Sequence, residues 1–483
     1  MSDTVVQSSA VDAVVGRAAG SGFSSSSLSD RMRALTALAA ALEAARDELV
    51  AIAAAETHLT PARLSGEVTR TANQLRFFAE VVGDGGFLEA TIDHADPSTT
   101  PPRPDLRRML RPLGVVAVFT ASNFPFAFSV LGNDTASALA AGCPVVVKAH
   151  PGHPRLSERT AELAADALAA AGVSADAIGL VDGVDAGVEL VRHPLVAAVA
   201  FTGSEHGGRA LFEVASSRPD PIPFYGELGS INPVVVTEAA ASADAAGLAA
   251  GLLEVVARDA GQFCTKPGLV FAPADSGFGR EVHDALAGAA AHPLLTTGMT
   301  RAFEHRVGDL STRGDVTVAR AAGDADGRPT VVSATVAAFL ADPDALIAEC
   351  FGPLTAIVSY ASDDELRSSL ALLPNSLTAT IRAARGEDVS DLAAILAPRC
   401  GRLVFGGWPT GVATAWAQHH GGAWPATTGS QHTSVGASSL RRFLTPVAYQ
   451  NAPEAVLPTA LLDANPLRIP RREDGRLVLA TGS

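Results

Sequence analysis

Short apolar segments alternate with alanine-rich helical patterns along the middle of this chain, and this alternation is what most limits its fold. Helical patterns at 134–141, 156–171 and 207–215 separate apolar segments at 113–119, 144–148, 178–181, 195–201 and 222–227. An order of strand, helix and strand is typical of parallel sheets covered by helices. We therefore predict an α/β fold whose first sheet is parallel.

A second run of the same pattern starts after Gly229. A strand is expected at 233–237, a helix at 243–260 and another strand at 269–272. The 483 residues of the chain exceed the roughly 250–300 at which a single core stops growing. The chain is therefore expected to divide into two or three domains, with a boundary near Gly229.

Weaker patterns flank these two runs. Leucines at helical spacing predict a helix over 29–56, with Ser29 or Asp30 as its N-cap, and a second helix is expected over 70–82. The proline-rich stretch 93–112 could form a linker or an extended arm that packs on a neighbouring subunit. Residues 405–436 are dense in Gly, Thr and His, and long loops of this kind are usually functional or interfacial.

Charge and hydropathy exclude several classes of partner. The chain carries 51 acidic and 36 basic side chains, and its net charge of −15 would repel a nucleic-acid backbone. The apolar runs are shorter than the ~20 residues of a membrane-spanning helix. Residues 1–27 lack the basic segment and apolar run of a signal peptide. We expect no nucleic-acid or membrane partner and a cytoplasmic location.

One of the four cysteines has a setting that suits catalysis. Cys143, Cys350 and Cys400 have no polar residues grouped around them, and no pair shows CxxC spacing, so free thiols are expected. Cys264 lies in Gly261-Gln-Phe-Cys-Thr-Lys-Pro-Gly268, where small and polar neighbours leave room for a substrate. A thiol there could attack a carbonyl carbon while a backbone N–H holds the oxyanion.

Two other polar residues follow predicted strands. Glu227 ends an apolar strand and could be a base that activates water, or it could cap the next helix or pair with an arginine. Asn123, in Ser122-Asn-Phe-Pro125, could be a turn residue or a donor aimed into a cleft at the carboxyl end of the sheet.

The cationic and imidazole side chains give weaker signals. Lys148 ends a predicted strand and is one of only two lysines, so its compact ammonium could be needed there, although chance retention explains it equally well. The segment Phe201-Thr-Gly-Ser204 runs from a strand into a helix N-terminus, which suits phosphate, but it lacks GxGxxG. Four histidines lack companion ligands at metal-binding spacing, so solvated loop histidines and no metal site are expected: His150, His153, His419 and His420.

Taken in chain order, these elements resemble six motifs of the aldehyde dehydrogenase superfamily over nearly the whole chain. The motifs are Ser122-Asn-Phe-Pro125, the strand-end Lys148, Phe201-Thr-Gly-Ser204, Glu227-Leu-Gly229, Gly261-Gln-Phe-Cys264 and Glu349-Cys-Phe-Gly-Pro353. Departures include Ser230 in place of a second glycine and Thr-Lys-Pro-Gly after the cysteine. With the loop sequences at 405–412 and 421–428, they resemble the α-ketoglutaric semialdehyde (2,5-dioxovalerate) dehydrogenase branch and related NADP-dependent enzymes.

The resemblance implies a domain layout. It predicts an α/β fold of aldehyde dehydrogenase type, with a Rossmann-type cofactor domain, an α/β catalytic domain and a small β oligomerisation arm. The expected divisions are the cofactor domain at 1–88 and 113–226, the arm at 89–112, the catalytic domain at 227–445 and a C-terminal tail at 446–483. The arm and the tail favour a homodimer or homotetramer.

The resemblance also implies an activity, the oxidation of an aldehyde to a carboxylic acid through a thiohemiacetal and a thioester. Cys264 would attack the aldehyde, Asn123 and the Cys264 N–H would hold the oxyanion, and Glu227 would activate water. The favoured reaction converts α-ketoglutaric semialdehyde to 2-oxoglutarate. A broad-specificity or fatty aldehyde dehydrogenase, an enzyme that passes the thioester to coenzyme A and an inactive structural family member are the alternatives.

The implied cofactor is NADP, with NAD as the alternative. Lys148 would reach the adenosine ribose, Ser204 the pyrophosphate, and Glu349 with Phe351 the nicotinamide ribose. NAD-preferring members usually carry a glutamate where this chain has Pro151, and losing that carboxylate removes repulsion of a 2′-phosphate. The remaining residues expected at the cofactor are Thr120, Thr202, Gly203 and Leu228.

The substrate pocket is inferred from the helix expected at 70–82. Arg70, Gln74 and Phe77 would share one face of that helix. The family places such a helix at the substrate tunnel, so Arg70 and Gln74 could bind a distal carboxylate beside Phe124. A surface ion pair or an interdomain contact is an equally good reading.

Overall fold

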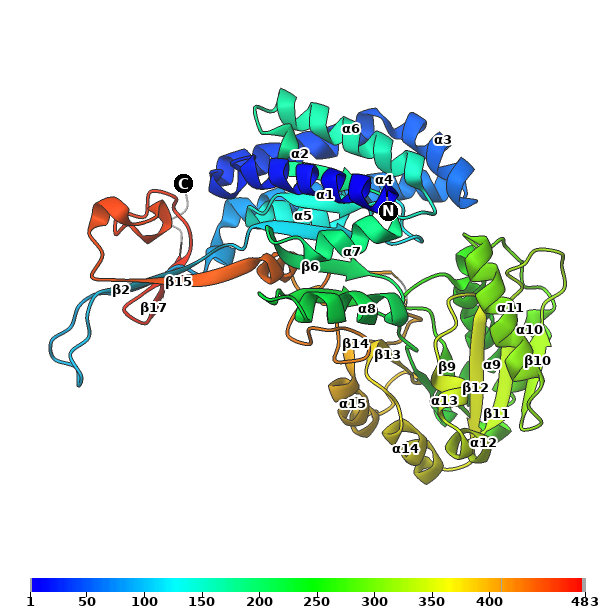
Figure 1. The fold of residues 1–483 in the computed structure, drawn as a ribbon. Helices are drawn as coiled ribbons and strands as arrows, with labels where there is room; N and C mark the ends of the chain where they lie inside the picture. The colour runs from blue at the N-terminus through cyan, green and yellow to red at the C-terminus, as the bar shows by residue number, and fades with distance from the viewer. Residues whose placement is uncertain (1, 410, 480–483) are drawn as a thin grey trace.

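The computed structural model describes residues 2–409 and 411–479, which form three β-sheets and their covering helices. Two larger α/β parts lie side by side, and a slender sheet projects from the first (Figure 1). The predicted α/β class is confirmed. The last residues of the expected C-terminal tail, 480–483, lie outside the described residues.

The first sheet is parallel throughout, with the strand order β5-β4-β3-β6-β7. The strand order reverses at the central strand β3, and in open α/β sheets ligands bind at the carboxyl ends of the strands beside such a point. The bounds are β3 Val115–Phe119, β4 Val145–Lys148, β5 Ile178–Val181, β6 Val196–Thr202 and β7 Phe224–Glu227.

Both faces of this sheet are buried, and its side chains alternate between two cores. Val116 and Val118 of β3 enter one core with helices α2, α4 and α6, whereas Val115 and Ala117 enter the opposite core with α1 and α7. Each fully buried valine stabilises the fold by about 1.5–3 kcal/mol, so a slip of one residue in register would be costly. The helices of this part are α1 Ser2–Gly20, α2 Leu28–Ala44, α3 Arg46–Thr57, α4 Pro61–Asp84, α5 Asn133–Ala141, α6 Pro154–Ala170, α7 Val184–Arg192 and α8 Glu205–Ser216.

The N-terminal helices differ from the prediction. The single helix expected over 29–56 is wrong, because the chain breaks at Ala45 into α2 and α3. The N-cap is Ser27 rather than Ser29 or Asp30, and Asp30 is the third residue of a capping box that Ser27 begins. Helix α4 starts nine residues earlier than expected, at Pro61 behind the cap Thr60.

The second sheet has seven strands in the order β10-β11-β12-β9-β8-β13-β14, all parallel except the edge strand β10. The strands are β8 Val234–Val236, β9 Leu269–Pro273, β10 Val316–Arg320, β11 Thr330–Thr335, β12 Leu354–Tyr360, β13 Ser376–Arg382 and β14 Cys400–Phe405. The helices are α9 Glu238–Ala257, α10 Phe278–Leu286, α11 Thr297–Ser311, α12 Val336–Ala341, α13 Asp344–Ile347, α14 Asp363–Ala371 and α15 Ser390–Leu396.

One helical stretch of this part, 238–261, is long and apolar enough to cross a membrane by length and composition, with a mean hydropathy of 1.4. The expectation that all apolar runs are short is therefore wrong here. Leu248, Leu252 and Val256 of α9 are buried in a core with strands β8 and β9 and helix α10. This packing against the sheet accounts for the apolar composition of the helix.

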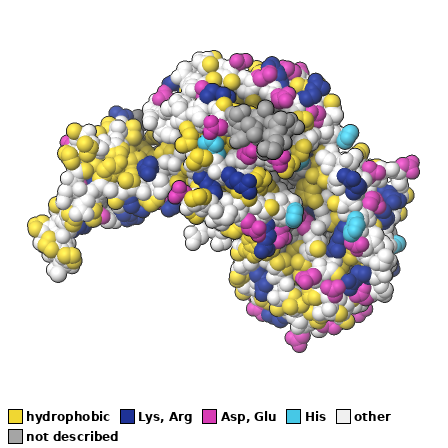
Figure 2. All heavy atoms as spheres, in the orientation of Figure 1, with side chains coloured by type: hydrophobic (Ala, Val, Ile, Leu, Met, Phe, Trp, Pro, Cys, Tyr) yellow, Lys and Arg dark blue, Asp and Glu magenta, His cyan; other side chains and the backbone are white. Residues whose placement is uncertain are grey.

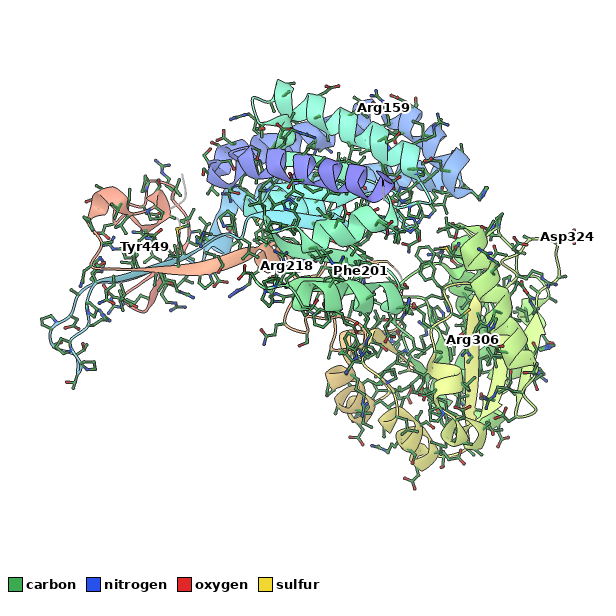
Figure 3. All side chains as sticks on the ribbon, in the orientation of Figure 1. Arg159, Phe201, Arg218, Arg306, Asp324 and Tyr449 are labelled. Carbon is green, nitrogen blue, oxygen red and sulfur yellow. The ribbon has the colours of Figure 1, made fainter. Side chains whose placement is uncertain are left out.

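The small third sheet joins segments from distant parts of the chain. Strand β2 Leu106–Pro112 lies between β15 Leu444–Gln450 and β1 Thr91–Asp93, β1 also pairs with β16 Arg471–Glu473, and β16 pairs with β17 Arg476–Val478. The proline-rich stretch and the C-terminal segment, expected as two separate features, thus form one sheet. Tyr449, labelled in Figure 3, lies on this projecting sheet. Figure 2 shows a broad hydrophobic area over it, whereas charges of both signs are mixed over the larger parts.

A buried arginine joins α2 to the end of α5, and this contact generates a test of the core. Gly142, the C-cap of α5, has φ +91°, and a Cβ there would lie within 2.8 Å of three atoms of the Arg31 guanidinium. Arg31 is 6% exposed and donates to the Ala141 carbonyl at 2.9 Å. Gly172, with φ +70°, has open space around its Cβ position.

We expect Gly142→Ala to lower the apparent Tm more than Gly172→Ala does. Both variants suffer the left-handed backbone cost of about 1–2 kcal/mol. Only Gly142→Ala also displaces the charged hydrogen bonds of Arg31, which are worth about 1.5–3 kcal/mol. Thermal unfolding followed by circular dichroism measures the difference. Equal losses in the two variants would contradict the proposed packing role of Arg31.

Candidate active site

The carboxyl ends of the parallel strands of the first sheet open onto a cavity of about 280 Å³. Phe119, Lys148, Thr202 and Glu227 end strands β3, β4, β6 and β7. The second sheet closes the cavity from the other side through the loop that carries Cys264. The lining residues are Ala121, Ser122, Asn123, Phe124, Phe128, His150, Thr202, Gly203, Ser204, Glu227, Leu228, Cys264, Met299, Glu349 and Phe351.

Cys264 follows a turn with an unusual backbone. Asp259, Ala260 and Gly261 have φ values of +45°, +54° and +63°, a left-handed conformation that non-glycine residues rarely adopt. At Gly261 the space is also closed, because a Cβ would lie 2.7 Å from the Gly352 carbonyl oxygen. Strain of this kind persists only where surrounding contacts enforce it, and it clusters at functional sites.

Asn123 lies directly against the cysteine loop. Its Nδ2 donates to the Gln262 carbonyl at 2.9 Å, and Asn123 itself is 8% exposed. The amide therefore faces the segment that carries Cys264, and both residues line the cavity. The other interpretation of Asn123, as a turn residue without contacts to distant loops, does not fit this hydrogen bond.

Arg63, which the sequence analysis did not single out, holds the two loops together. Its Nη2 donates to the Asn123 carbonyl at 2.8 Å and its Nε donates to Asp259 at 2.6 Å. Its Nη1 donates to Glu67 at 2.7 Å, and the other oxygen of Glu67 accepts from the N–H groups of Phe126 and Ala127. One guanidinium thus contacts both the Asn123 loop and the strained turn before Cys264.

Glu227, Cys264 and His420 form a cluster on the cavity wall. The Nε2 of His420 lies 2.9 Å from Oε1 of Glu227 and 3.5 Å from Sγ of Cys264. The second oxygen of Glu227 accepts from the Ser434 hydroxyl at 2.6 Å. His420 is fully buried, so the expectation of a solvated loop histidine is wrong for this residue. Spacing could not reveal it, because His420 lies 156 residues from Cys264 and 193 from Glu227.

The electrostatics of this cluster oppose a free thiolate. Burial raises the pKa of Cys264 well above its usual range, and both the negative charge of Glu227 and its hydrogen bond with the thiol raise it further. Burial alone would raise the pKa of Glu227, but the contacts with His420 and Ser434 outweigh burial and hold that pKa below the ordinary value. Glu227 is therefore a carboxylate next to a protonated thiol.

Two arginines lie within electrostatic reach of Cys264. Arg70 stacks over the rings of Phe124 and Phe128, at 5.0 and 5.6 Å from their centroids. Arg402 on β14, which the sequence analysis did not mention, is the second. Burial lowers the pKa of both guanidinium groups, although both stay cationic at neutral pH.

Gln74 lies apart from the cavity. It is 1% exposed, and its amide makes a long contact of 3.5 Å to the Ala127 carbonyl. Its Oε1 has no hydrogen-bond partner among the described residues. Neither Gln74 nor Arg70 is among the residues that line the cavity, and Arg70 contacts it only through the rings of Phe124 and Phe128.

Most residues expected at a cofactor line the same cavity. Ser204 caps helix α8 and accepts from the Gly207 N–H at 3.2 Å, while a Cβ at Gly203 would meet the ring of Phe201 at 2.8 Å. Phe201, labelled in Figure 3, is on β6. The buried Thr202 hydroxyl has no hydrogen-bond partner among the described residues. A glycine, an unpaired hydroxyl and a helix N-terminus together fit a pyrophosphate.

The remaining cofactor candidates lie beside or at the edge of this cavity. Thr120 donates to the Lys148 carbonyl at 3.1 Å, which joins the ends of β3 and β4. Burial lowers the pKa of Lys148, and Asp182 opposes that effect. Burial raises the pKa of Glu349 to about 7.

His150 and His153 also differ from the solvated loop residues expected. Their rings stack at 5.6 Å, and His153 is fully buried with Nε2 3.0 Å from the Ala121 carbonyl oxygen. His150 lines the cavity, and burial lowers its pKa to about 3. Both rings are therefore neutral at physiological pH and pack the end of the sheet.

Comparisons with known proteins agree with the motif order. Residues 5–445 match the family described as the aldehyde dehydrogenase family. The chain is 46% identical over 470 residues to alpha-ketoglutaric semialdehyde dehydrogenase 2 of Azospirillum brasilense, covering 92% of this chain and 88% of the relative. It is 39% identical over 453 residues to alpha-ketoglutaric semialdehyde dehydrogenase of Acinetobacter baylyi, covering 92% and 86%.

Solved structures support the fold. A 3,6-anhydro-L-galactose dehydrogenase in complex with NAP has a TM-score of 0.78 at 21% identity, covering 92% of this chain and 91% of that one. A bifunctional proline utilization A protein has a TM-score of 0.78 at 23% identity, covering 92% of this chain and 45% of that one.

The contacts of Arg63 predict how the two loops respond to its loss. We expect Arg63→Ala to speed amide hydrogen exchange at least tenfold in both 123–127 and 259–264, because one side chain anchors both segments. Arg63→Lys, which keeps the charge but loses the planar fork, should lie between the wild type and Arg63→Ala. Exchange read by mass spectrometry is the measurement. Arg76 lies on α4, as Arg63 does, and forms an ion pair with Glu43 of α2. Arg76→Ala is therefore the control and should leave both segments unchanged. Protection lost in only one loop would contradict the bridging role.

Proposed function

The chain belongs to the aldehyde dehydrogenase family, and from that membership we propose that it oxidises α-ketoglutaric semialdehyde to 2-oxoglutarate with NADP as the preferred cofactor. The observation that carries the chemistry is the cluster of Cys264, Glu227 and His420 on a cavity that Asn123 also lines. The substrate assignment is supported by the names of the two relatives at 46% and 39% identity and by the cationic side chain of Arg70 near Cys264.

Cys264 is proposed as the nucleophile. Because its pKa is raised, attack on the aldehyde carbon requires that the thiol proton leave at the same time. The carboxylate of Glu227, to which the thiol is hydrogen-bonded, accepts this proton and then releases it to solvent, while the Nε2–H of His420 donates to Glu227 at 2.9 Å and holds it in place. The oxygen of the adduct is held by the Asn123 amide and the Cys264 N–H. A donor in such an oxyanion site contributes about 3–4 kcal/mol.

Glu227 is proposed to act in the second half of the reaction. A bound nicotinamide dinucleotide supplies the hydride acceptor that converts the cysteine adduct into a thioester. Glu227, whose pKa is held low, takes a proton from the water that hydrolyses the thioester. The Ser434 hydroxyl, 2.6 Å from Glu227, fixes the direction of the carboxylate. A carboxylate in this position favours release of a free acid over transfer to coenzyme A.

We propose that the cofactor residues have the roles that the family motifs imply. Thr202, Gly203 and Ser204 would hold the pyrophosphate, Glu349 and Phe351 the nicotinamide ribose, and Lys148 the adenosine ribose. Thr120 and Leu228 would complete the site. Preference for NADP is supported by Pro151 in place of a glutamate, because no carboxylate at that position repels a 2′-phosphate.

The domain roles and the assembly are also proposals. The first sheet with its helices, 1–88 and 113–226, would bind the cofactor, and 227–445 would carry the nucleophile. The small sheet, which contains the expected arm 89–112 and much of the tail 446–483, would mediate a homodimer or homotetramer. Its exposed Val456 and Leu477, at 60% and 63%, support a contact surface there. We also propose a cytoplasmic location.

The activity is tested by following the absorbance of reduced nicotinamide with a panel of aldehydes. We expect kcat/KM to be highest for α-ketoglutaric semialdehyde, followed by succinic semialdehyde, with alkanals lowest, and NADP to exceed NAD. Cys264→Ala should abolish turnover while cofactor still binds. No oxidation of any aldehyde would overturn the proposal, and a preference for long alkanals would replace the substrate by the fatty aldehyde alternative.

Arg70 is expected to recognise the distal carboxylate. Arg70→Ala should lower kcat/KM for α-ketoglutaric semialdehyde by about 10–100-fold, since a charge-assisted contact is worth about 1.5–3 kcal/mol. The loss with pentanal, a neutral aldehyde of equal length, should stay under about threefold. The ratio of the two losses is the measurement, and equal losses on both aldehydes would sink the assignment.

A further inference from the structure

The side chains of Cys264, His420 and Glu227 supply a thiol sulfur, an imidazole nitrogen and a carboxylate oxygen within 4.8 Å of one another. These are the three ligand types that zinc selects in proteins. We propose that this cluster is an inhibitory zinc site, in which Zn²⁺ binds reversibly to all three residues and blocks aldehyde oxidation. The inhibitory part rests on the proposed function, whereas the metal site rests on the cluster alone.

The distances between the ligand atoms nearly match a zinc site. With Zn–S of about 2.3 Å and Zn–N or Zn–O of about 2.0–2.1 Å, the ligand atoms of a tetrahedral site lie about 3.3–3.6 Å apart. The sulfur of Cys264 is 3.5 Å from Nε2 of His420, which in turn is 2.9 Å from Oε1 of Glu227. All three ligand atoms lie within 4.8 Å of one another, so side-chain adjustment toward these separations would be needed to hold the ion.

The fourth position of such a site faces the cavity. Cys264 and Glu227 both line the 280 Å³ space, through which a cation would reach them. His420 closes the site from behind, with its backbone N–H donating to Thr433 at 2.8 Å. Three protein ligands and one open position leave room for water on the metal.

The surroundings favour an exchangeable ion over a resident one. Histidines that hold a resident zinc usually donate their second ring nitrogen to a carboxylate or carbonyl group. Nδ1 of His420 is buried and has no hydrogen-bond partner among the described residues. Glu227 does have outer support, because Ser434 donates to its other oxygen. Partial support of this kind predicts reversible binding that a chelator removes.

Binding of Zn²⁺ displaces protons and involves no change of oxidation state. Zn²⁺ forms a bond to sulfur as the thiol proton passes to solvent. The Nε2 proton that His420 donates to Glu227 moves to Nδ1, which is unpartnered among the described residues, and this frees the Nε2 lone pair and an oxygen of Glu227 to bind the metal. The sulfur lone pair needed for attack on an aldehyde and the Glu227 oxygen needed to activate water are then both engaged. Mg²⁺, which prefers six oxygen ligands, should not bind to this set.

The metal site is tested first without turnover, by titrating the full-length protein with Co²⁺ as a spectroscopic stand-in for Zn²⁺. A near-ultraviolet band from thiolate bound to cobalt is expected in the wild type and should vanish in Cys264→Ser. His420→Gln should weaken binding at least tenfold. His419→Gln, one position away, is the matched control and should leave the titration unchanged. A band that persists in Cys264→Ser would overturn the site by assigning the metal to another thiol.

Inhibition is then measured on the wild type with Zn²⁺, Mg²⁺ and EDTA. Zn²⁺ should inhibit competitively with the aldehyde, EDTA should restore the rate, and Mg²⁺ at the same concentration should have no effect. His419→Gln, the matched control, should share the apparent inhibition constant of the wild type. Inhibition by Mg²⁺ as strong as that by Zn²⁺, or inhibition by Zn²⁺ that EDTA does not reverse, would overturn the proposal. If the wild type oxidised no aldehyde, the proposed function would fail while the cobalt titration still decided the metal site.

Discussion

One guanidinium group, that of Arg63, contacts both of the larger parts of this protein. Arg63 binds the Asn123 carbonyl of the first part and Asp259 of the second, and Asn123 reaches across to the Gln262 carbonyl. The strained turn before Cys264 follows from this arrangement, because left-handed Asp259 and Ala260 need an external partner to persist. The relative position of the thiol and the Asn123 amide therefore depends on a side chain from a third element, helix α4.

Few of the charged side chains that the structure describes surround the thiol of Cys264, and together with burial they determine its protonation state. The chain as a whole carries a net charge of −15, and two carboxylates, the buried Glu227 and the more exposed Glu349, line the same cavity as Cys264. The repulsion between Glu227 and a thiolate raises the pKa of Cys264, so the resting site stores the sulfur as a thiol. Arg70 and Arg402 are cations within electrostatic reach of Cys264, and anion binding is proposed for Arg70 and Lys148. The buried His420 lies within 3.5 Å of both the thiol sulfur and the Glu227 carboxylate.

Several sequence predictions failed for identifiable physical reasons. Leucines at helical spacing continue through Ala45 without a signal for a break, yet the chain turns there, and both α2 and α3 pack on α4 and α6. Solvated loop residues are expected at His150, His153 and His420 because none of them has companion ligands at metal-binding spacing, whereas their partners in space come from other strands and loops.

The sequence by itself determined the local elements and their order. Alternation of apolar strands and helices predicts the parallel sheets, and strand-end motifs place Asn123, Lys148, Ser204 and Glu227 on one edge, because parallel strands share a carboxyl end. Only the tertiary structure decided which loops of the second part meet that edge. The contacts of His420 and Ser434 with Glu227, and of Arg63 with two loops, join residues far apart in the chain. Such contacts depend on how the two sheets pack against each other. The periodicity and spacing of residues within one segment carry no information about that packing.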